Sequence, residues 1–204
     1  MKTLLDFINT VQPLSADSLA ALQTCFERKC YRAGTLLLSA GEVCQHLYFI
    51  ERGLTRIFEI DTKGNEITSA FRAEFEVVRS SSSFYDQQPA LESIEILEDS
   101  ILWCISYQNL KYLQSKYLDV ANLSLRILEN GIKSYERRIK QLRDLSVEAH
   151  YIEFNQQQRH LACRVQIRQL ATYLGTTPTN LSRIRHLLTD IDRVTFSNPV
   201  KAAI

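Results

Sequence analysis

The chain has 204 residues, of which 45% are hydrophobic and 23% are charged, and this composition suits one large or two small globular domains. Its formal net charge of +1 conceals a division, because residues 1–106 carry 9 basic and 15 acidic side chains while residues 107–204 carry 15 and 8. No apolar run reaches the ~20 residues that span a bilayer, the start of the chain lacks a secretory signal, and the five cysteines are scattered, so we expect a cytoplasmic protein with reduced thiols and no membrane contact.

The first half of the chain is predicted to contain a short helix followed by many strands. The helix covers residues 14–26, with Ser15 as its cap. After it, short β-rich runs alternate with turn signals, a spacing typical of an antiparallel sandwich or small barrel. The expected strands are residues 35–39, 47–50, 54–60, 66–72, 93–97 and 101–105.

The second half is predicted to be helical. A short helix over residues 108–117 precedes a long one over residues 118–145, and a further helix starts at Ser146. Apolar residues recur in the long helix at steps of four and three, which predicts a parallel coiled-coil seam between two copies of the chain. The alternative is that these residues pack on the chain's own sheet domain. The predicted dimer-interface residues are Leu125, Leu128, Ile132, Tyr135, Ile139 and Leu142.

Residues 164–188 read as two short helices joined by a tight turn. Small Ala171 permits close helix approach, and Gly175 sits at the bend, where a left-handed backbone costs least. Thr177 suits the cap of the second helix, and Pro178 suits its first turn. This spacing predicts a helix-turn-helix, the motif that lays its second helix in the major groove of DNA. The apolar residues expected between the two helices are Ile167, Leu170, Leu174, Leu181 and Ile184.

The outward positions of this segment are rich in hydrogen-bond donors. Residues 159–185 contain five arginines and no acidic residue, which favours a DNA reader over the alternative of a plain helical hairpin. Arg183 is the candidate for bidentate recognition of a guanine, and Arg168 and Arg185 are candidate phosphate contacts. The predicted DNA-binding residues are Arg168, Thr177, Thr179, Asn180, Ser182, Arg183 and Arg185.

The whole plan resembles the cyclic-AMP receptor/Fnr (Crp/Fnr) superfamily of transcription regulators, over nearly the full chain. The predicted helix-turn-helix matches the family in Ala171-x-x-x-Gly175 followed by Leu181-Ser182-Arg183-Ile184. The segments that match the family's roll are residues 34–36, 41–42, 46–50 and 61–67, together with Gly53.

The resemblance implies an α+β fold in three parts. These are an antiparallel β-roll (a double-stranded β-helix like the cyclic-nucleotide-binding domain) at residues 1–117, a dimerisation helix at residues 118–145, and a helix-turn-helix domain at residues 146–204. As partners it implies double-stranded DNA with a near-palindromic site, a second copy of the chain, RNA polymerase and a small-molecule effector. It implies no enzyme activity.

The family residues that hold cyclic AMP are replaced in this chain. In the family, a Gly-Glu pair holds the ribose and an Arg further along pairs with the cyclic phosphate. The family segment that carries these residues is called the phosphate cassette. When it is aligned with residues 77–96 without gaps, the Gly-Glu pair aligns with Arg79-Ser80 and the phosphate Arg aligns with Ala90. Because losing a desolvated, charge-assisted phosphate contact costs several kcal/mol, we expect no useful affinity for cyclic AMP.

Two other features of the first half are candidates for an effector site. Guanidinium and hydroxyl donors near residue 80 suggest a different anion pocket, although we favour a solvated loop there. Several aromatic residues are candidates for the lining of an apolar cavity, although we favour a core role for them. The candidate pocket residues are Arg79, Ser80, Ser81 and Phe84, and the aromatic residues are Phe71, Phe75, Phe84, Tyr85 and Trp103.

Other sensor and enzyme chemistries lack their ligands in this sequence. An iron–sulfur cluster needs four cysteines, and only Cys25 and Cys30 lie close together. Haem needs an axial histidine, and His46, alone in the first 106 residues, suits a packing or turn role. A cupin-like enzyme needs two or three histidines and a carboxylate. We therefore expect no cofactor and no metal.

The reading helix and the end of the chain depart from the family. Thr179 stands where the family commonly has a Glu that accepts from cytosine N4, so we expect a different half-site. Only 16 residues follow Leu188, so the winged hairpin is curtailed, with one short strand expected at residues 194–196 before Asn198-Pro199. DNA-backbone contacts must then come from elsewhere.

The sequence therefore predicts a homodimeric, sequence-specific DNA-binding transcription regulator of the Crp/Fnr type, whose effector is not cyclic AMP. One alternative is a constitutive DNA binder. Another is an effector-binding module whose helical head contacts proteins only.

Overall fold

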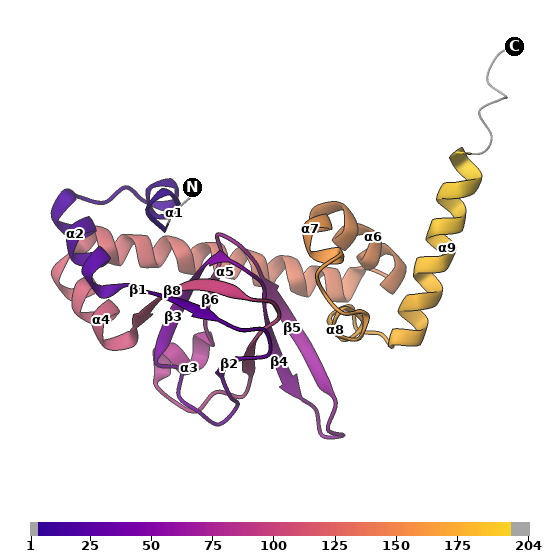
Figure 1. The fold of residues 1–204 in the computed structure, drawn as a ribbon, viewed down its shortest axis with the longest axis horizontal. Coiled ribbons are helices and arrows are strands. Elements are labelled where there is room, and N and C mark those ends of the chain that lie inside the picture. The colour runs from indigo at the N-terminus through magenta and orange to yellow at the C-terminus, as the bar shows by residue number, and fades with distance from the viewer. Residues whose placement is uncertain (1–3, 197–204) are drawn as a thin grey trace, which may run out of the picture. The chain divides into compact units, whose positions relative to one another are not determined.

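The computed structural model describes residues 4–196, and for residues 189–196 it describes the backbone only. The chain divides into two compact units, a first unit up to Lys140 and a second unit from Gln141. The first unit combines sheets with helices, and the described part of the second is helical (Figure 1).

The strands of the first unit form a roll of two antiparallel sheets. They are β1 (Glu27–Tyr31), β2 (Leu36–Leu38), β3 (His46–Arg52), β4 (Thr55–Ile60), β5 (Glu66–Arg72), β6 (Val77–Val78), β7 (Ser93–Ile96) and β8 (Ser100–Ser106). One sheet has the order β1-β8-β3-β6 and the other has the order β2-β7-β4-β5. The β1–β8 pairing joins segments that are about seventy residues apart, for example Glu27 opposite Cys104, and places β1 at the edge of the first sheet.

Helices cover one end of the roll. They are α1 (Leu4–Val11), α2 (Ala16–Cys25), α3 (Ser81–Asp86), α4 (Tyr107–Lys116) and the long α5 (Leu118–Asp144). Figure 1 shows α2 and α4 beside the first turns of α5. Asp119 of α5 fastens this end, because its carboxylate accepts from the Ser15 N–H at 2.8 Å and from the Ser18 hydroxyl at 2.6 Å.

The core of the roll collects large side chains from both sheets and from one face of α5. Val120 and Leu123 of α5 are buried in it, so the first turns of the long helix complete the roll rather than stand free. The fully buried strand residues of this core include Phe49, Ile50, Leu102, Ile94 and Ile96.

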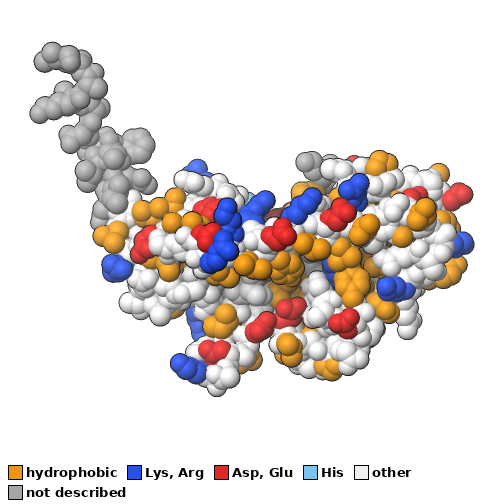
Figure 2. All heavy atoms as spheres, turned by 180° about the vertical axis from the view of Figure 1, so that it is seen from behind, with side chains coloured by type: hydrophobic (Ala, Val, Ile, Leu, Met, Phe, Trp, Pro, Cys, Tyr) orange, Lys and Arg blue, Asp and Glu red, His pale blue; other side chains and the backbone are white. Residues whose placement is uncertain are grey.

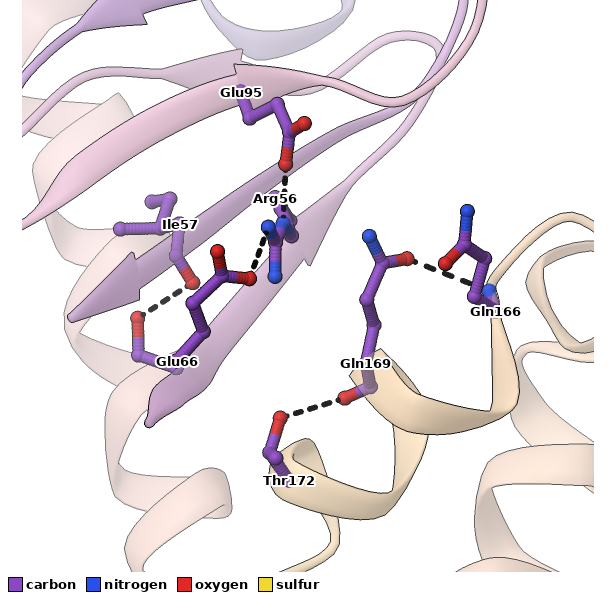
Figure 3. Close-up of polar contacts among 8 residues, drawn as sticks. Arg56, Ile57, Glu66, Glu95, Gln166, Gln169 and Thr172 are labelled. Atoms are coloured by element: carbon purple, nitrogen blue, oxygen red, sulfur yellow. Dashed lines mark hydrogen bonds and ion pairs between the residues drawn. The ribbon is translucent and has the colours of Figure 1, made fainter. Parts of the chain in front are cut away.

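A buried arginine ties the strands of the second sheet together. Arg56 of β4 is only 5% exposed, and its guanidinium donates to Glu95 of β7 at 2.5 Å and to Glu66 of β5 at 2.6 Å (Figure 3). It also lies 4.1 Å from the ring centre of Phe58. Because this buried charge has two carboxylate partners, it holds three neighbouring strands without an uncompensated charge.

The second unit contains four helices among its described residues. They are α6 (Val147–Gln157), α7 (Arg159–Ala162), α8 (Ile167–Tyr173) and α9 (Pro178–Phe196). Ser146 caps α6, as its position in the sequence predicted, by accepting from the Ala149 N–H at 3.2 Å. Across the described residues, no helix is both long and apolar enough to cross a membrane.

The α+β fold class is confirmed, with six predicted strands, the long helix and the helix pair near the C-terminus all present. Prediction missed three short helices, α1, α3 and α7, and two strands, β1 and β6. β1 has the sequence ERKCY, and four of its five residues are exposed, because it forms the edge of its sheet. A charged edge strand lacks the apolar alternation by which strands are found.

Two local predictions are wrong. Residues 79–83 are not a solvated loop, because α3 starts at Ser81 and both Ser80 and Ser83 are buried. Residues 194–196 are not a strand, because α9 stays helical through Phe196. Asn198-Pro199 lies outside the described residues.

Candidate nucleic-acid interface

The turn between α8 and α9 has the geometry that its sequence predicted. Gly175 has a φ of +73°, in the left-handed region. The Gly175 N–H donates to the Thr172 carbonyl at 3.1 Å and the Thr176 N–H donates to the Ala171 carbonyl at 2.9 Å. This pair of bonds is the Schellman arrangement, which satisfies the last carbonyls of α8 and turns the chain sharply.

Both helices of the pair are capped by side chains. At the start of α8, Gln166 and Gln169 form a reciprocal capping box, and Figure 3 shows the bond from the Gln166 N–H to Gln169 Oε1, 3.4 Å long. At the start of α9, Thr177 accepts from the Asn180 N–H at 3.2 Å, and Pro178 occupies the first helical position. The sequence predicted Thr177 and Pro178 in these roles.

The two helices pack closely through the predicted apolar residues. Ala171 and Leu181 are completely buried, and Ile184 is 1% exposed. A small residue at position 171 therefore lets the backbones of α8 and α9 approach. The packing fixes which side of α9 faces outward.

The outward face of α9 carries donors and no carboxylate among its described side chains. Thr179, Arg183 and His186 are exposed and Ser182 is half-buried. These four residues follow the helical spacing i, i+3, i+4, i+7, so they share one face. His186 was missed by the sequence prediction, although the helical period counted from Thr179 would have found it.

Two residues that were predicted to face DNA make hydrogen bonds to other residues of the second unit. Asn180 donates from Nδ2 to Thr176 Oγ1 at 2.9 Å and accepts at Oδ1 from Arg183 Nη2 at 3.0 Å. Arg185 is half-buried rather than outward, and its Nε donates to the Tyr151 hydroxyl at 3.1 Å. Both positions lie on the flanks of α9, next to the turn and to α6, which is why their side chains find partners there. Arg168, by contrast, is exposed on α8.

A groove of about 590 Å³ runs beside Arg185 within the second unit. Among the side chains that the structure describes, its wall holds two guanidinium groups, two amides and a phenol and no acidic group. Its lining residues are Tyr151, Ile152, Asn155, Gln156, Arg159, Arg185 and Leu188.

Helix α5 has one face on the roll and an exposed apolar stripe, defined as Leu125, Leu128, Ile132, Tyr135, Ile139 and Leu142. Leu128 is half-buried, and the other five are at least half exposed, reaching 63% at Ile139. Figure 2, which views the molecule from behind, shows hydrophobic side chains between charged ones along this side. The alternative that the stripe packs on the chain's own sheets therefore does not hold for these five residues.

A cavity of about 260 Å³ lies in the first unit, against the middle of α5. Of the four residues predicted for an effector pocket, Arg79 and Ser81 line it. Ser80 and Phe84 are fully buried and do not line it, which corrects the prediction for these two. The remaining polar lining consists of Arg72, Glu76, Asn130, Ser134 and Tyr135, and Gly131 also lines the cavity.

Arg79 is the most unusual group of this cavity. Its Nε is buried and has no hydrogen-bond partner, and its guanidinium lies 5.2 Å from the ring centre of Tyr85. A buried donor without a partner is costly. The cavity therefore offers a positive, unsatisfied group on its wall.

The aromatic residues of the first half do not share one cavity. Phe71 and Phe84 are buried, as the core interpretation predicted. Phe75 is 39% exposed and lines the cavity beside Arg79. Trp103 is half-buried and donates from Nε1 to Glu51 at 2.6 Å.

His46 has the packing role that its position predicted. It is half-buried in β3 with its ring centre 6.0 Å from that of Tyr48, and burial lowers the pKa of His46. Among the described residues, no group of three or more His, Cys, Asp and Glu side chains is arranged to hold a metal ion.

The fold defines a class of protein, a cyclic-nucleotide-binding-like roll followed by a long helix and a helix-turn-helix. The profile of the cyclic nucleotide-binding domain family matches residues 28–117, from β1 to the end of α4. The fumarate and nitrate reduction regulatory protein of Vibrio cholerae serotype O1 is 26% identical over 183 residues, covering 84% of this chain and 72% of that protein.

Solved structures share the fold at low sequence identity. A Crp/Fnr-family transcriptional regulator from Eubacterium rectale superposes with a TM-score of 0.71 at 17% identity, covering 87% of this chain and 85% of that one. FixK2 from Bradyrhizobium japonicum superposes with a TM-score of 0.68 at 17% identity, covering 82% and 86%. Residues 28–117 thus match the cyclic nucleotide-binding domain family, and the chain as a whole is similar in sequence to an Fnr-type regulator and in fold to a Crp/Fnr-family regulator.

Proposed function

We propose that this chain is a homodimeric, sequence-specific DNA-binding regulator that acts in the cytoplasm. The observation that carries the proposal is the outward face of α9, where Thr179, Ser182, Arg183 and His186 offer hydrogen-bond donors and no carboxylate. Such a face suits a negatively charged duplex with acceptor groups on its base edges. The rigid capped turn behind it supports this proposal, since readout needs a fixed helix.

In the proposed complex, α9 of each subunit enters a major groove, and the half-sites lie about one helical turn apart, ~34 Å. Arg183 pairs with a guanine through its guanidinium edge, with Thr179 and Ser182 as neighbouring readers. Arg168 and Arg185 contact phosphates. Arg185 does so from the rim of the groove beside α6.

The exposed apolar stripe of α5 is the proposed dimer seam. Its 4-3 spacing matches the a and d positions of a coiled coil, and exposed apolar residues in such a row gain from burial against a second helix. On this proposal residues 1–117 form the sensor, residues 118–145 the dimerisation helix and residues 146–204 the DNA-binding part.

We further propose that the 260 Å³ cavity takes an anionic effector, because Arg79 and Arg72 line it and Arg79 Nε is unsatisfied. The effector is not cyclic AMP. The cassette positions of the family are occupied by Ser80, which is completely buried, and by Ala90, which is buried and uncharged. An effector shifts DNA binding only if it binds two arrangements of the protein with different affinity, and without such a difference the chain is a constitutive binder.

Cyclic AMP binding is the first prediction to check. Titration calorimetry with cyclic AMP should give no heat of binding up to millimolar ligand, because buried Ser80 and Ala90 stand where the family has the ribose Glu and the phosphate Arg. Micromolar affinity would contradict the conclusion that the residues needed for cyclic AMP are replaced in this chain. It would also contradict the proposal that the cavity takes a different anion.

The function itself is tested by selecting binding sites from random duplex DNA with the purified full-length chain. The expected product is a near-palindrome whose two half-sites have a fixed spacing. A selection that returns no enriched sequence would instead favour a head that contacts proteins, including RNA polymerase, without reading DNA.

A further inference from the structure

We propose that Asn180 is a positioning residue that fixes the guanidinium of Arg183 for base recognition, an inference that rests on the proposed function. Asn180 sits one turn before Arg183 on α9 and bonds to Arg183 Nη2 at 3.0 Å and to Thr176 Oγ1 at 2.9 Å. The base reader is therefore tied through one amide to the turn of the motif.

The direction of these bonds follows from the chemistry of the groups. A guanidinium has donors only, so the acceptor that faces Arg183 must be the amide oxygen of Asn180. The amide nitrogen then faces Thr176, whose hydroxyl oxygen accepts from it. No flipped amide satisfies both partners.

Thr176, which accepts a hydrogen bond from the Asn180 amide, is itself held in place. Its own N–H is held by the Ala171 carbonyl in the Schellman turn, directly after Gly175. The Asn180 backbone is fixed as well, by the Thr177 cap. The position of the Arg183 guanidinium is thus set by the turn geometry rather than by its long, flexible stem.

Positioning increases the discrimination that one arginine supplies. A free arginine side chain loses about 2 kcal/mol of rotamer entropy when it is ordered, and a side chain held before binding loses less. One N–H of Arg183 is used by Asn180, and four of the five guanidinium donors stay available for guanine O6 and N7 and for a phosphate.

Direct reading by Asn180 is the competing account. Asparagine reads adenine with its amide oxygen and nitrogen together, and here both atoms already have protein partners. Asn180 is also half-buried on the flank of α9, whereas Thr179 and Arg183 are exposed. The two accounts differ in the base pair at which an Asn180 variant changes preference.

The experiment measures affinities of the full-length protein for duplexes carrying each base pair at every position of the selected half-site. The variants are Arg183→Ala, Asn180→Ala, their double variant and Thr176→Val, with Asn109→Ala on α4 as a control that removes an exposed amide elsewhere. Thermal unfolding of each variant reports whether the fold is kept.

Arg183→Ala should reduce discrimination at one position by ~5- to 150-fold. Asn180→Ala should reduce discrimination at that same position by ~3- to 10-fold, in line with the net contribution of one typical hydrogen bond. Thr176→Val should act at that position more weakly, Asn109→Ala should have no effect, and Asn180→Ala should add nothing once Arg183 is alanine.

Other outcomes overturn the inference. If Asn180→Ala changes preference at a different base pair, weakens all duplexes equally, or acts as strongly in the Arg183→Ala background, then Asn180 does not position Arg183. If Arg183→Ala relaxes the preference and Asn180→Ala leaves it intact, only the inference fails. If the unaltered protein shows no preference, the proposed function fails with it.

Discussion

Gly53 occupies the turn between β3 and β4, where it adopts a φ of +124°. A Cβ atom added there would lie 1.9 Å from the Ser100 hydroxyl oxygen and 2.9 Å from the Ser100 Cα. We expect Gly53→Ala to lower the free energy of unfolding by about 2–5 kcal/mol, from backbone strain and steric overlap together. Denaturant unfolding measures this loss.

Gly64→Ala is the matched control for that substitution. Gly64 also has a positive φ, +82°, but an added Cβ would meet nothing within 4 Å. We expect a loss of about 1–2 kcal/mol from the left-handed backbone alone. Equal losses at the two glycines would show that contact with Ser100 is unimportant.

Asp119 makes the stability of the first unit depend on pH. The hydrogen bond from Ser18, together with those from the backbone N–H groups of Ser15 and Val120, lowers the pKa of Asp119. Its folded pKa is thus below its unfolded value of about 3.9, so the stabilisation is complete well above pH 4 and is lost as the pH falls through the folded pKa.

Asp119→Ala should therefore destabilise the chain by about 1 kcal/mol at pH 7, a value reduced by solvent screening. The difference from the unaltered chain should shrink as unfolding is followed towards pH 3. A deficit that stays constant with pH would mean that the charge of Asp119 does not matter.

At the scale of elements, α5 has one face that is buried against the roll and another that is exposed. Val120 and Leu123 are buried in the roll, whereas Ile132 and Ile139 of the stripe are 57% and 63% exposed. We expect the double variant Ile132→Glu/Ile139→Glu to be monomeric by light scattering under conditions where the unaltered chain is dimeric, because charges would be buried in the seam. Its circular dichroism should be unchanged.

Asn122→Glu is the control for the stripe, since Asn122 is exposed on α5 and lies outside the stripe. This variant should keep the mass of the unaltered chain. A stripe variant that still dimerises would place the interface on another surface.

At the scale of the whole molecule, basic charge is concentrated in the second half of the chain, which has 15 Lys and Arg against 8 Asp and Glu. We expect Arg168→Ala to weaken binding to all duplexes equally and to reduce the slope of log affinity against log salt by about one phosphate contact. Arg52→Ala, which removes an exposed charge from β3 of the roll, should leave the slope unchanged. The same change in both variants would mean that contact with phosphate is not localised to the second unit.

Local pattern predicted most of the elements. β5 and the turn at Gly175 were placed correctly because alternation, a left-handed glycine and caps are properties of neighbouring residues. β1 was missed because its charged residues become a strand only through pairing with β8, which lies far away in the sequence. Helix α3 was missed because a run of serines has low helix propensity, and burial of Ser80, Ser83 and Phe84 decides its conformation.

The sequence predicted which residue types lie at the candidate interface, but it predicted only in part which of their side chains face outward. Arg183 and Thr179 are exposed on α9 as expected. Asn180 and Arg185 have partners within the protein, because their places on the flanks of α9 depend on where Thr176 and Tyr151 lie.

The amino-acid sequence by itself determined most of the strands and helices and their order, the apolar stripe of α5 and the acid-free segment at residues 159–185, because each depends on the periodicity and chemistry of nearby residues. Tertiary structure alone decided the pairing of β1 with β8, the cavity beside Arg79 and the hydrogen bonds that join Thr176 through Asn180 to Arg183. These features depend on which groups come into contact after the chain has packed. The pattern of neighbouring residues along the sequence does not specify such contacts.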